Sequence, residues 1–232
     1  HPKPRHELGC RYREGVRMTA ASQFFALLLA NQAVVPVTVV EALDSNGGSA
    51  TRTFAATPTN GDLIVLIAAS TGSGTITAPA GGFTNGPSVN NGGTRPVALF
   101  WKVASGESGA SYTVGGTGVT PVTYGAILRG QNATPVGNSG SNTGASVSSL
   151  AMSSSALSIT SGSYVLGLLV ASGTTSARAF SNSFTIAPTI FNSGRFFACS
   201  RLYASGGASE NTTASWTTAR NVSGLLVEIK AV

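Results

Sequence analysis

The chain has 232 residues, of which 42% are hydrophobic and only 9% are charged, and its formal net charge is +6. Globular domains usually carry about a quarter of their residues as charged side chains. A surface of hydroxyls and amides is poorly protected from self-association by charge, so the composition suits packed assemblies better than free cytosolic enzymes. The length allows one large all-β domain or two small ones.

The positive charge is concentrated in the first 17 residues. The basic residues there are Lys3, Arg5, Arg11, Arg13 and Arg17. Against two glutamates they leave a net charge of +3, which equals the net charge of the other 215 residues. A basic arm can bind nucleic acid or an acidic protein surface. The alternative is a solvated leader, or an extension upstream of a natural start at Met18.

An apolar run, Phe24–Ala30, follows the basic residues. It is too short to span a bilayer, and we therefore expect no membrane span. We interpret it as a short helix or an apolar arm that docks on a neighbouring subunit or on the edge of the domain. Its anchoring side chains would be Phe24, Phe25, Leu27 and Leu28. The predicted organisation is an arm at residues 1–34 followed by a β-domain at 35–232.

From residue 35 onward the sequence is typical of β-strands. Short runs of β-branched and aromatic residues alternate with turn clusters of Gly, Asn, Ser and Pro. Asp62–Ala69 is continuously apolar, which predicts a strand buried on both faces. Thr71–Asn91 is rich in loop-forming residues. The first predicted strands are Val37–Glu41, Thr51–Ala55, Asp62–Ala69, Pro96–Val103, Ser111–Val114 and Val122–Leu128.

The same plan recurs about 100 residues later, so that 60–129 and 161–230 form an internal repeat. Phe83-Thr84 matches Phe184-Thr185, and Ala104-Ser105-Gly106 matches Ala204-Ser205-Gly206. A period this long indicates a duplicated supersecondary unit rather than a solenoid. The second set of predicted strands is Tyr164–Ala171, Phe184–Ile186, Phe196–Tyr203, Thr213–Thr217 and Gly224–Lys230. In the last strand, period-two alternation predicts that Leu226, Glu228 and Lys230 lie nearer water.

The predicted fold is all-β, because many short strands occur without βα alternation. The sequence favours one jelly-roll-like two-sheet sandwich built from two duplicated halves, with an N-terminal arm or short helix before it. Gln131–Ser149, rich in Gly, Ser and Asn, is interpreted as a polar connection between the repeats. Two tandem sandwiches are the alternative, which the lack of a charged or proline-rich linker disfavours.

Residues suited to catalysis are few. The only histidines, His1 and His6, lie in the arm, so the body has no Ser-His-Asp or Cys-His arrangement. Glu107 and Glu210 occupy matching turns and are expected to be solvated rather than paired as glycosidase acids. The Asp-Ser-Asn sequence at 44–46 resembles a fragment of a calcium loop without its other ligands. We therefore expect a protein that is not an enzyme and that needs no metal or cofactor.

Other recurring residues have structural explanations. Asp62 and its counterpart Ser163 follow a glycine at the start of a strand, where either side chain can cap a turn. Arg95 and Arg195 precede matching strands and are expected to pair with acids or to cap carbonyls. Cys199 lies within a predicted strand and is expected to be a buried free thiol.

A series of short motifs runs through the body in a characteristic order. In chain order they are Gly61–Val65, Thr77–Thr84, Ala98–Ala104, Glu107, Ser111–Val114, Ala126–Gly130 and Thr134–Val136. This order resembles a group of small bacteriophage and prophage virion proteins of jelly-roll type, whose second half ends much as Ala214–Trp216 and Gly224–Lys230 do here. The resemblance spans roughly residues 35–230. Phe83 departs from it, because a tryptophan is usual there, and the proline that often follows the acid is absent at 109–110.

The resemblance implies a virion component: a capsid decoration protein, a head or tail fibre module, or a minor tail protein. The function that we favour is a non-enzymatic capsid-decorating or particle-surface protein, located in the virion and anchored by its arm. Its expected partners are other capsid or tail proteins and further copies of itself.

Two alternatives remain open. One is an adhesin at a tail or fibre tip that binds host glycans through exposed aromatic side chains. The candidates for that contact are Trp101, Tyr112, Tyr203 and Trp216. The other is a capsid protein whose basic arm contacts nucleic acid in a salt-dependent way. Five basic residues make nucleic acid the less favoured partner.

Overall fold

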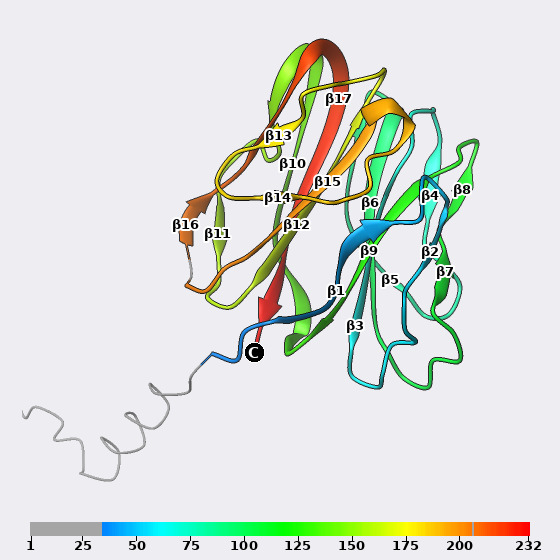
Figure 1. Cartoon of the computed structure of the whole chain (residues 1–232), viewed down its shortest axis with the longest axis vertical. Helices are drawn as coiled ribbons and strands as arrows, with labels where there is room; N and C mark the ends of the chain where they lie inside the picture. The colour runs from blue at the N-terminus through cyan, green and yellow to red at the C-terminus, as the bar shows by residue number, and fades with distance from the viewer. Residues whose placement is uncertain (1–33, 206) are drawn as a thin grey trace, which may run out of the picture. The chain divides into compact units, whose positions relative to one another are not determined.

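The computed structural model describes residues 34–205 and 207–232 (Figure 1). Of the predicted arm, residues 1–34, only Val34 belongs to this part. The described chain is built almost entirely of antiparallel strands, with one short 3-10 turn, η1 (Asn192–Gly194). The predicted all-β class is therefore confirmed.

Two large sheets form the body. The first contains β1 (Thr38–Ser45), β9 (Val122–Arg129), β3 (Leu63–Ala69), β6 (Thr94–Val103) and β5 (Thr84–Asn91), in that spatial order. The second contains β10 (Gln131–Ala151), β17 (Thr213–Ala231), β12 (Tyr164–Ala171), β15 (Phe196–Leu202) and β14 (Thr185–Ile186), in that order. Each sheet comes from one part of the chain, and we call residues 34–130 the first half and 131–232 the second half.

Shorter strands form a second layer in each half. In the first half, β2 (Thr51–Thr53) pairs with β7 (Ser111–Thr113), and β4 (Thr75–Thr77) pairs with β8 (Gly115–Thr117). In the second half, β11 (Leu157–Ile159) pairs with β16 (Gly207–Glu210), and β13 (Ala179–Phe180) pairs with the start of β17. The chain thus passes repeatedly between a main sheet and a covering layer, as in a jelly roll.

The two halves match strand for strand. β10, β17, β12, β15 and β14 follow one another across the second sheet as β1, β9, β3, β6 and β5 do across the first. The covering pairs correspond in the same way, and the long β17 takes the places of both β8 and β9. This agreement confirms the predicted sandwich of two duplicated halves. It also extends the correspondence to strands that lie before residues 60 and 161.

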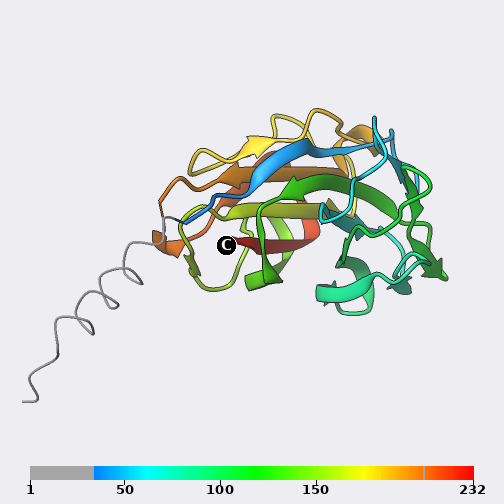
Figure 2. The ribbon, with the colours of Figure 1, turned by 90° about the horizontal axis from the view of Figure 1, so that it is seen from below.

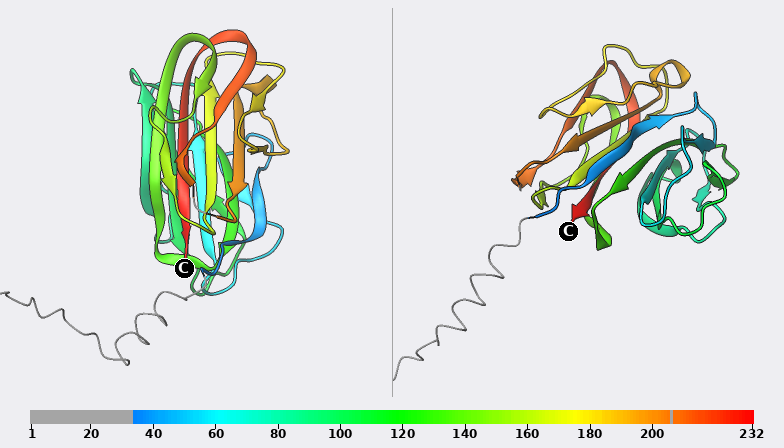
Figure 3. Two further views of the ribbon diagram at one scale, coloured as in Figure 1. Left: turned by 90° about the vertical axis from the view of Figure 1, so that its left-hand side faces the viewer. Right: turned by 60° about the horizontal axis from the view of Figure 1, so that its bottom comes forward.

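The sheets pack face to face, with their strands running along the same long direction (Figure 3). At one edge β1 contacts β15 of the other sheet (Figure 2), and at the opposite edge β5 contacts β10 and β17. Alternate residues of β3 point to opposite faces. Leu63, Val65 and Ile67 join the central apolar cluster between the sheets, whereas Ile64 and Leu66 join an outer cluster beneath the covering layer. β3 and β12 are therefore buried on both faces, as the sequence predicts for β3.

A pair of compensating substitutions distinguishes the two halves. Leu66 of β3 faces Gly125 of β9, whereas the matching positions of the second half hold Gly167 facing Leu226. A Cβ atom on Gly125 would lie 2.8 Å from Leu66 Cδ2, and one on Gly167 would lie 3.1 Å from Leu226 Cδ1. Each pair has room for one large side chain, and the two halves place it on different strands.

Several predicted boundaries are wrong. Gln131–Ser149 is not a connection, because it belongs to β10, a polar edge strand whose pairing with β17 is interrupted by bulges. Thr71–Asn91 contains β4 and β5. The last two predicted strands form the single strand β17. The predicted exposure of Leu226 and Glu228 is also wrong, because both are buried: Leu226 packs in the outer cluster of the second half, and Glu228 is hydrogen-bonded to residues 138, 160 and 163.

Candidate functional site

The carboxylates of the body hold the fold together. Two of the eight acidic residues, Glu7 and Glu14, precede residue 34, which leaves six in the described part of the chain. Each of the six accepts at least one hydrogen bond from within the protein. They are Glu41, Asp44, Asp62, Glu107, Glu210 and Glu228.

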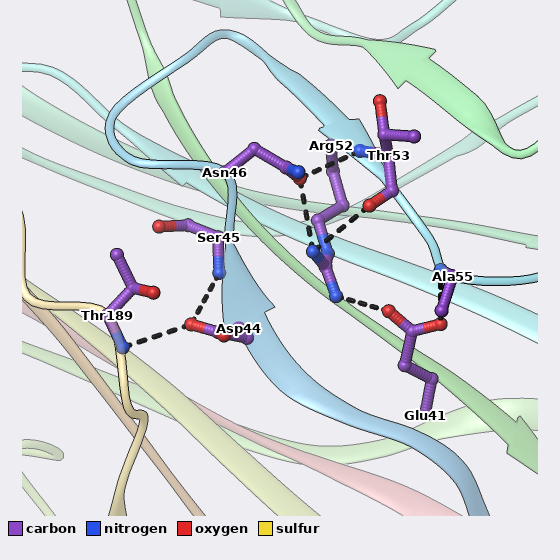
Figure 4. Close-up of polar contacts among 8 residues, drawn as sticks. All are labelled: Glu41, Asp44, Ser45, Asn46, Arg52, Thr53, Ala55 and Thr189. Carbon is purple, nitrogen blue, oxygen red and sulfur yellow. Dashed lines mark hydrogen bonds and ion pairs between the residues drawn. The ribbon is translucent and has the colours of Figure 1, made fainter.

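Glu41 and Arg52 join β1 to β2 (Figure 4). Arg52 is only 6% exposed, and its guanidinium donates to Glu41 Oε1, to Asn46 Oδ1 at 3.0 Å and to the carbonyl oxygen of Thr53 at 3.1 Å. The other oxygen of Glu41 accepts the backbone N–H of Ala55 at 2.8 Å. A buried arginine with this set of partners fixes a loop.

Asp44 links the two halves at the end of β1. Its Oδ1 atom accepts the backbone N–H of Ser45 at 2.8 Å and that of Thr189, in the second half, at 3.0 Å (Figure 4). Tyr124 makes a parallel link, since its hydroxyl donates to the carbonyl oxygen of Thr189 at 2.9 Å. Residue 44 therefore serves the interface between the halves.

Asp62 caps the turn that precedes β3, as the sequence predicts. Its Oδ2 atom accepts the backbone N–H and the hydroxyl of Thr59, and Oδ1 accepts Arg129 Nε at 2.8 Å. Burial alone would raise the pKa of this carboxyl, but the hydrogen bonds from Thr59 and Arg129 lower it below its usual value.

Glu228 has the matching task in the second half. It is fully buried, and it accepts the backbone N–H groups of Thr160 and Asn138 at 2.6 and 3.0 Å and the Ser163 hydroxyl at 2.9 Å. Burial tends to raise its pKa, but these donors hold the pKa below its usual value. The carboxylate is thus compensated by hydrogen bonds rather than by a cation.

Glu107 and Glu210 each accept a tyrosine hydroxyl beside a basic side chain. Glu107 accepts the Tyr112 hydroxyl at 3.0 Å and pairs with Lys102 at 2.7 Å. Glu210 accepts the Tyr203 hydroxyl at 3.2 Å and lies 3.7 Å from Arg201. These acids are tied to neighbours in their own halves, and the expectation that they are simply solvated is wrong.

The predicted glycan contacts are mostly inside the protein. Tyr112, Tyr203 and Trp216 are 9%, 3% and 4% exposed, so the prediction that they are exposed is wrong. They pack in the outer clusters, which the covering strands create and which alternation alone does not reveal. Trp101 is half-buried against the central cluster, and Phe100 lies on the opposite face of the strand.

The predicted anchoring residues of the arm lie outside the described residues. They are Lys3, Arg5, Arg11, Arg13, Arg17, Phe24, Phe25, Leu27 and Leu28. Within the described residues, Cys199 is a fully buried free thiol, as predicted. Arg95 and Arg195 form no ion pair there, so that alternative for them is wrong.

A groove opens between β4 and β5 on the first half. It has two adjoining parts of about 210 and 350 Å³, and both are lined by Thr75, Ile76, Ser88 and Ala98. Phe100 completes the floor of the larger part. Exposed hydroxyls thus surround an apolar floor, a combination suited to binding rather than to proton transfer. We regard this groove as the candidate functional site.

Sequence reasoning missed the groove because Thr71–Asn91 had no assigned strands. The motif match gave no signal for it, because that match aligns Ala98 with Ala198. Only the strand pairings make Ala98, opposite Ala68, the counterpart of Phe197, opposite Leu169, and so show that the two halves differ in side-chain volume there.

Across residues 34–205 and 207–232, no group of three or more His, Cys, Asp or Glu side chains is placed to hold a metal ion. No helix in that part of the chain has the length and apolar character needed to cross a membrane. Comparison with family models, with curated proteins and with solved structures returns no match.

Proposed function

We propose that this chain is a non-enzymatic structural protein of a virion, decorating a capsid or another particle surface and anchored there by its N-terminal arm. The observation that carries the proposal is the use of its carboxylates. All six in the body accept hydrogen bonds that fix turns, strands or the interface between the halves. Carboxylates that accept hydrogen bonds in this way make the fold rigid rather than take part in acid–base chemistry.

The architecture and the composition support the same role. Each main sheet lies between the other main sheet and its own covering layer, and the body contains three apolar clusters. Only 9% of the chain is charged, which leaves little electrostatic repulsion between neighbouring copies. The motif order from Gly61 to Val136 resembles jelly-roll virion proteins and supplies the particle context.

Two variants of the full chain test the anchor. In one, Phe24, Phe25, Leu27 and Leu28 become Ser; in the other, Lys3, Arg5, Arg11, Arg13 and Arg17 become Gln. Each is expressed during particle formation, and its copy number is measured by quantitative mass spectrometry of purified particles. The proposal expects the Ser variant to unfold at the wild-type temperature and to be lost from particles by at least about tenfold, a difference of ~1.4 kcal/mol.

The Gln variant distinguishes the roles of the arm. Normal incorporation supports an apolar anchor. Loss of the Gln variant alone, together with loss of salt-dependent nucleic-acid binding, would favour the capsid protein with a basic arm. Full incorporation of both variants would refute anchoring by the arm.

Glycan binding is the second candidate, because Trp101 keeps a partly exposed ring at the end of β6. Tryptophan presents a large amphipathic surface of the kind that binding sites use. A glycan array probed with wild-type protein and with Trp101→Ala checks this function. Binding that is lost in the variant supports an adhesin, and an array without hits removes it.

A further inference from the structure

The groove has a filled counterpart in the second half. In the first half Ala68 of β3 pairs with Ala98 of β6, whereas the matching pair in the second half is Leu169 of β12 with Phe197 of β15. These two positions on the outer face of the main sheet thus carry a methyl group in one half and a large side chain in the other, and Ala98 lines the groove.

The covering layer shows the same contrast. Ile76 of β4 pairs with Gly116, and its counterpart Phe180 of β13 pairs with Ala214. Two residues after Ala214, β17 continues with Trp216, whereas β8 ends at Thr117. The first half therefore has the smaller side chain at each of these positions of its covering layer.

In the second half these large side chains pack together. The Phe197 ring lies 5.5 Å from Phe180 and 6.2 Å from Trp216, measured between ring centroids. Ile76 and Ala98, the counterparts of Phe180 and Phe197, provide no such rings. Phe100 in place of Cys199 restores only part of the volume, and a groove remains. The two halves share one backbone plan, so the groove results from side-chain replacement.

One side of the groove is a free strand edge. β4 is paired only with β8 among the described strands, whereas β5, the last strand of its sheet, contacts β10 and β17 of the other sheet. An edge strand offers unpaired backbone donors and acceptors to an added strand. In the second half β13, the counterpart of β4, contacts β14, so the equivalent edge is closed there.

The lining also defines the chemistry of an occupant. Thr75, Thr77, Asn85 and Ser88 are uncharged and exposed around the apolar floor. Uncharged rims favour an uncharged guest, because a charged group would lose hydration without gaining a partner. The floor lacks the volume that a phenyl or indole ring fills in the other half.

We propose that the groove between β4 and β5 binds an extended segment of a partner protein, with an aromatic or large aliphatic side chain of that segment lying over Ala98. Backbone hydrogen bonds along the free edge of β4 align the segment, and the ring replaces the one that Phe197 supplies in the second half. The inference rests on the proposed assembly role for the nature of the partner. Peptide binding is measured without particles, so its failure leaves the anchor experiment unaffected.

The probe is a synthetic peptide, acetyl-Thr-Phe-Thr-Phe-Thr-amide, titrated into the isotope-labelled full chain and followed by backbone amide NMR. We expect saturable shifts confined to Thr75–Thr77, Ser88–Asn90 and their neighbours, with a Kd of about 1 mM or tighter. A peptide with Lys in place of both Phe is the control and is expected to produce no saturable shifts. Maltohexaose is titrated in parallel as a neutral saccharide.

Ala98→Phe copies the second half and closes the groove. We expect it to weaken binding of the Phe peptide by at least about tenfold. Ile76→Phe also fills the groove, and it is used for the same measurement if Ala98→Phe does not fold. Val103→Phe adds the same ring at an exposed position of β6 outside the groove and should leave the affinity unchanged. Unaltered affinity in a folded filling variant, shifts elsewhere on the protein, binding of the saccharide alone, or no binding would each overturn the proposal.

Discussion

Glu228 accepts the backbone N–H of Thr160 at 2.6 Å, although 68 residues separate the two in the chain. The matching threonine of the first half, Thr59, donates instead to Asp62, at 2.9 Å. One turn therefore has the same requirement in both halves, an acceptor for the threonine N–H. The first half meets it with the residue before β3, and the second half meets it with a residue of β17. The position of Asp62 holds Ser163 in the second half, and the Ser163 hydroxyl donates to Glu228.

We expect Glu228→Gln to lower the free energy of unfolding by about 1.5–3 kcal/mol at pH 7, because a charged acceptor of three donors becomes a neutral amide. The pKa of Glu228 is lowered on folding, so its contribution is complete above the unfolded pKa and is lost as the pH falls through the folded pKa. Urea unfolding of wild type and variant should therefore differ at pH 7 and converge in acid.

Glu210→Gln is the matched control for that experiment. The Glu210 side chain is 27% exposed and its ion pair with Arg201 is long, at 3.7 Å. A partly exposed pair of this kind contributes about 1 kcal/mol or less. A loss for Glu210→Gln as large as that for Glu228→Gln would contradict the special role of the buried carboxylate.

Asp62 and Arg129 form an ion pair whose two members should contribute unequally. Asp62 is 1% exposed, and Thr59 depends on it for two hydrogen bonds, whereas the Arg129 side chain is 56% exposed. We expect Asp62→Ala to cost about 1–3 kcal/mol because the Thr59 N–H loses its acceptor. Arg129→Ala should cost less than about 1 kcal/mol. Equal losses in chemical denaturation would show that the ion pair, rather than the turn, carries the energy.

The sequence predicts the main sheets well, because their apolar runs report burial directly. Asp62–Ala69 and Tyr164–Ala171 contain β3 and β12, and the repeat predicts that they are equivalent. The edge strands are harder to find. β10 consists largely of Gly, Ser, Asn and Thr, whose side chains meet water and whose pattern is that of a loop. Only pairing with a distant strand, β17, makes it a strand.

The polar sites depend on the covering layers, which is why they escape sequence analysis. Alternation along β17 separates Leu225 and Val227 from Leu226 and Glu228 correctly, since the two sets face different clusters. It does not say what lies over the second face. The donors that surround Glu228 come from residues 138, 160 and 163, which reach it through the fold.

The glycine that faces Leu66 offers a direct test of packing in the duplicated core. A methyl group on Gly125 would meet Leu66, Arg52 and Phe54 at 2.8–3.0 Å, so Gly125→Ala should cost about 1–3 kcal/mol. Leu66→Ala alone should cost about 2–5 kcal/mol through the cavity it leaves. In the double variant the methyl group occupies part of that cavity. We expect the double variant to lose less stability than the sum of the two single losses, by about 0.5–3 kcal/mol.

Gly109→Ala controls for the intrinsic effect of replacing glycine, because nothing lies within 4 Å of its added methyl group. It should change stability by no more than about 0.5 kcal/mol. If the stability losses of Leu66→Ala and Gly125→Ala are strictly additive, the two positions do not share space. That result would contradict the compensating exchange of Leu and Gly between the halves.

The reactivity of Cys199 shows whether the outer apolar cluster of the second half, to which it belongs, is closed to solvent. Burial raises the pKa of its thiol well above the usual value, so little thiolate exists in the folded protein, and the side chain has no exposed surface. In a Cys10→Ser background, we expect Ellman's reagent to label the native protein only as fast as it unfolds, and to label it at once in denaturant. Ser105→Cys in the same background places a thiol at an exposed turn and should react immediately. Rapid labelling of Cys199 under native conditions, with unfolding slow by circular dichroism, would mean that β15 is open to solvent and that the cluster around Phe197 is not closed.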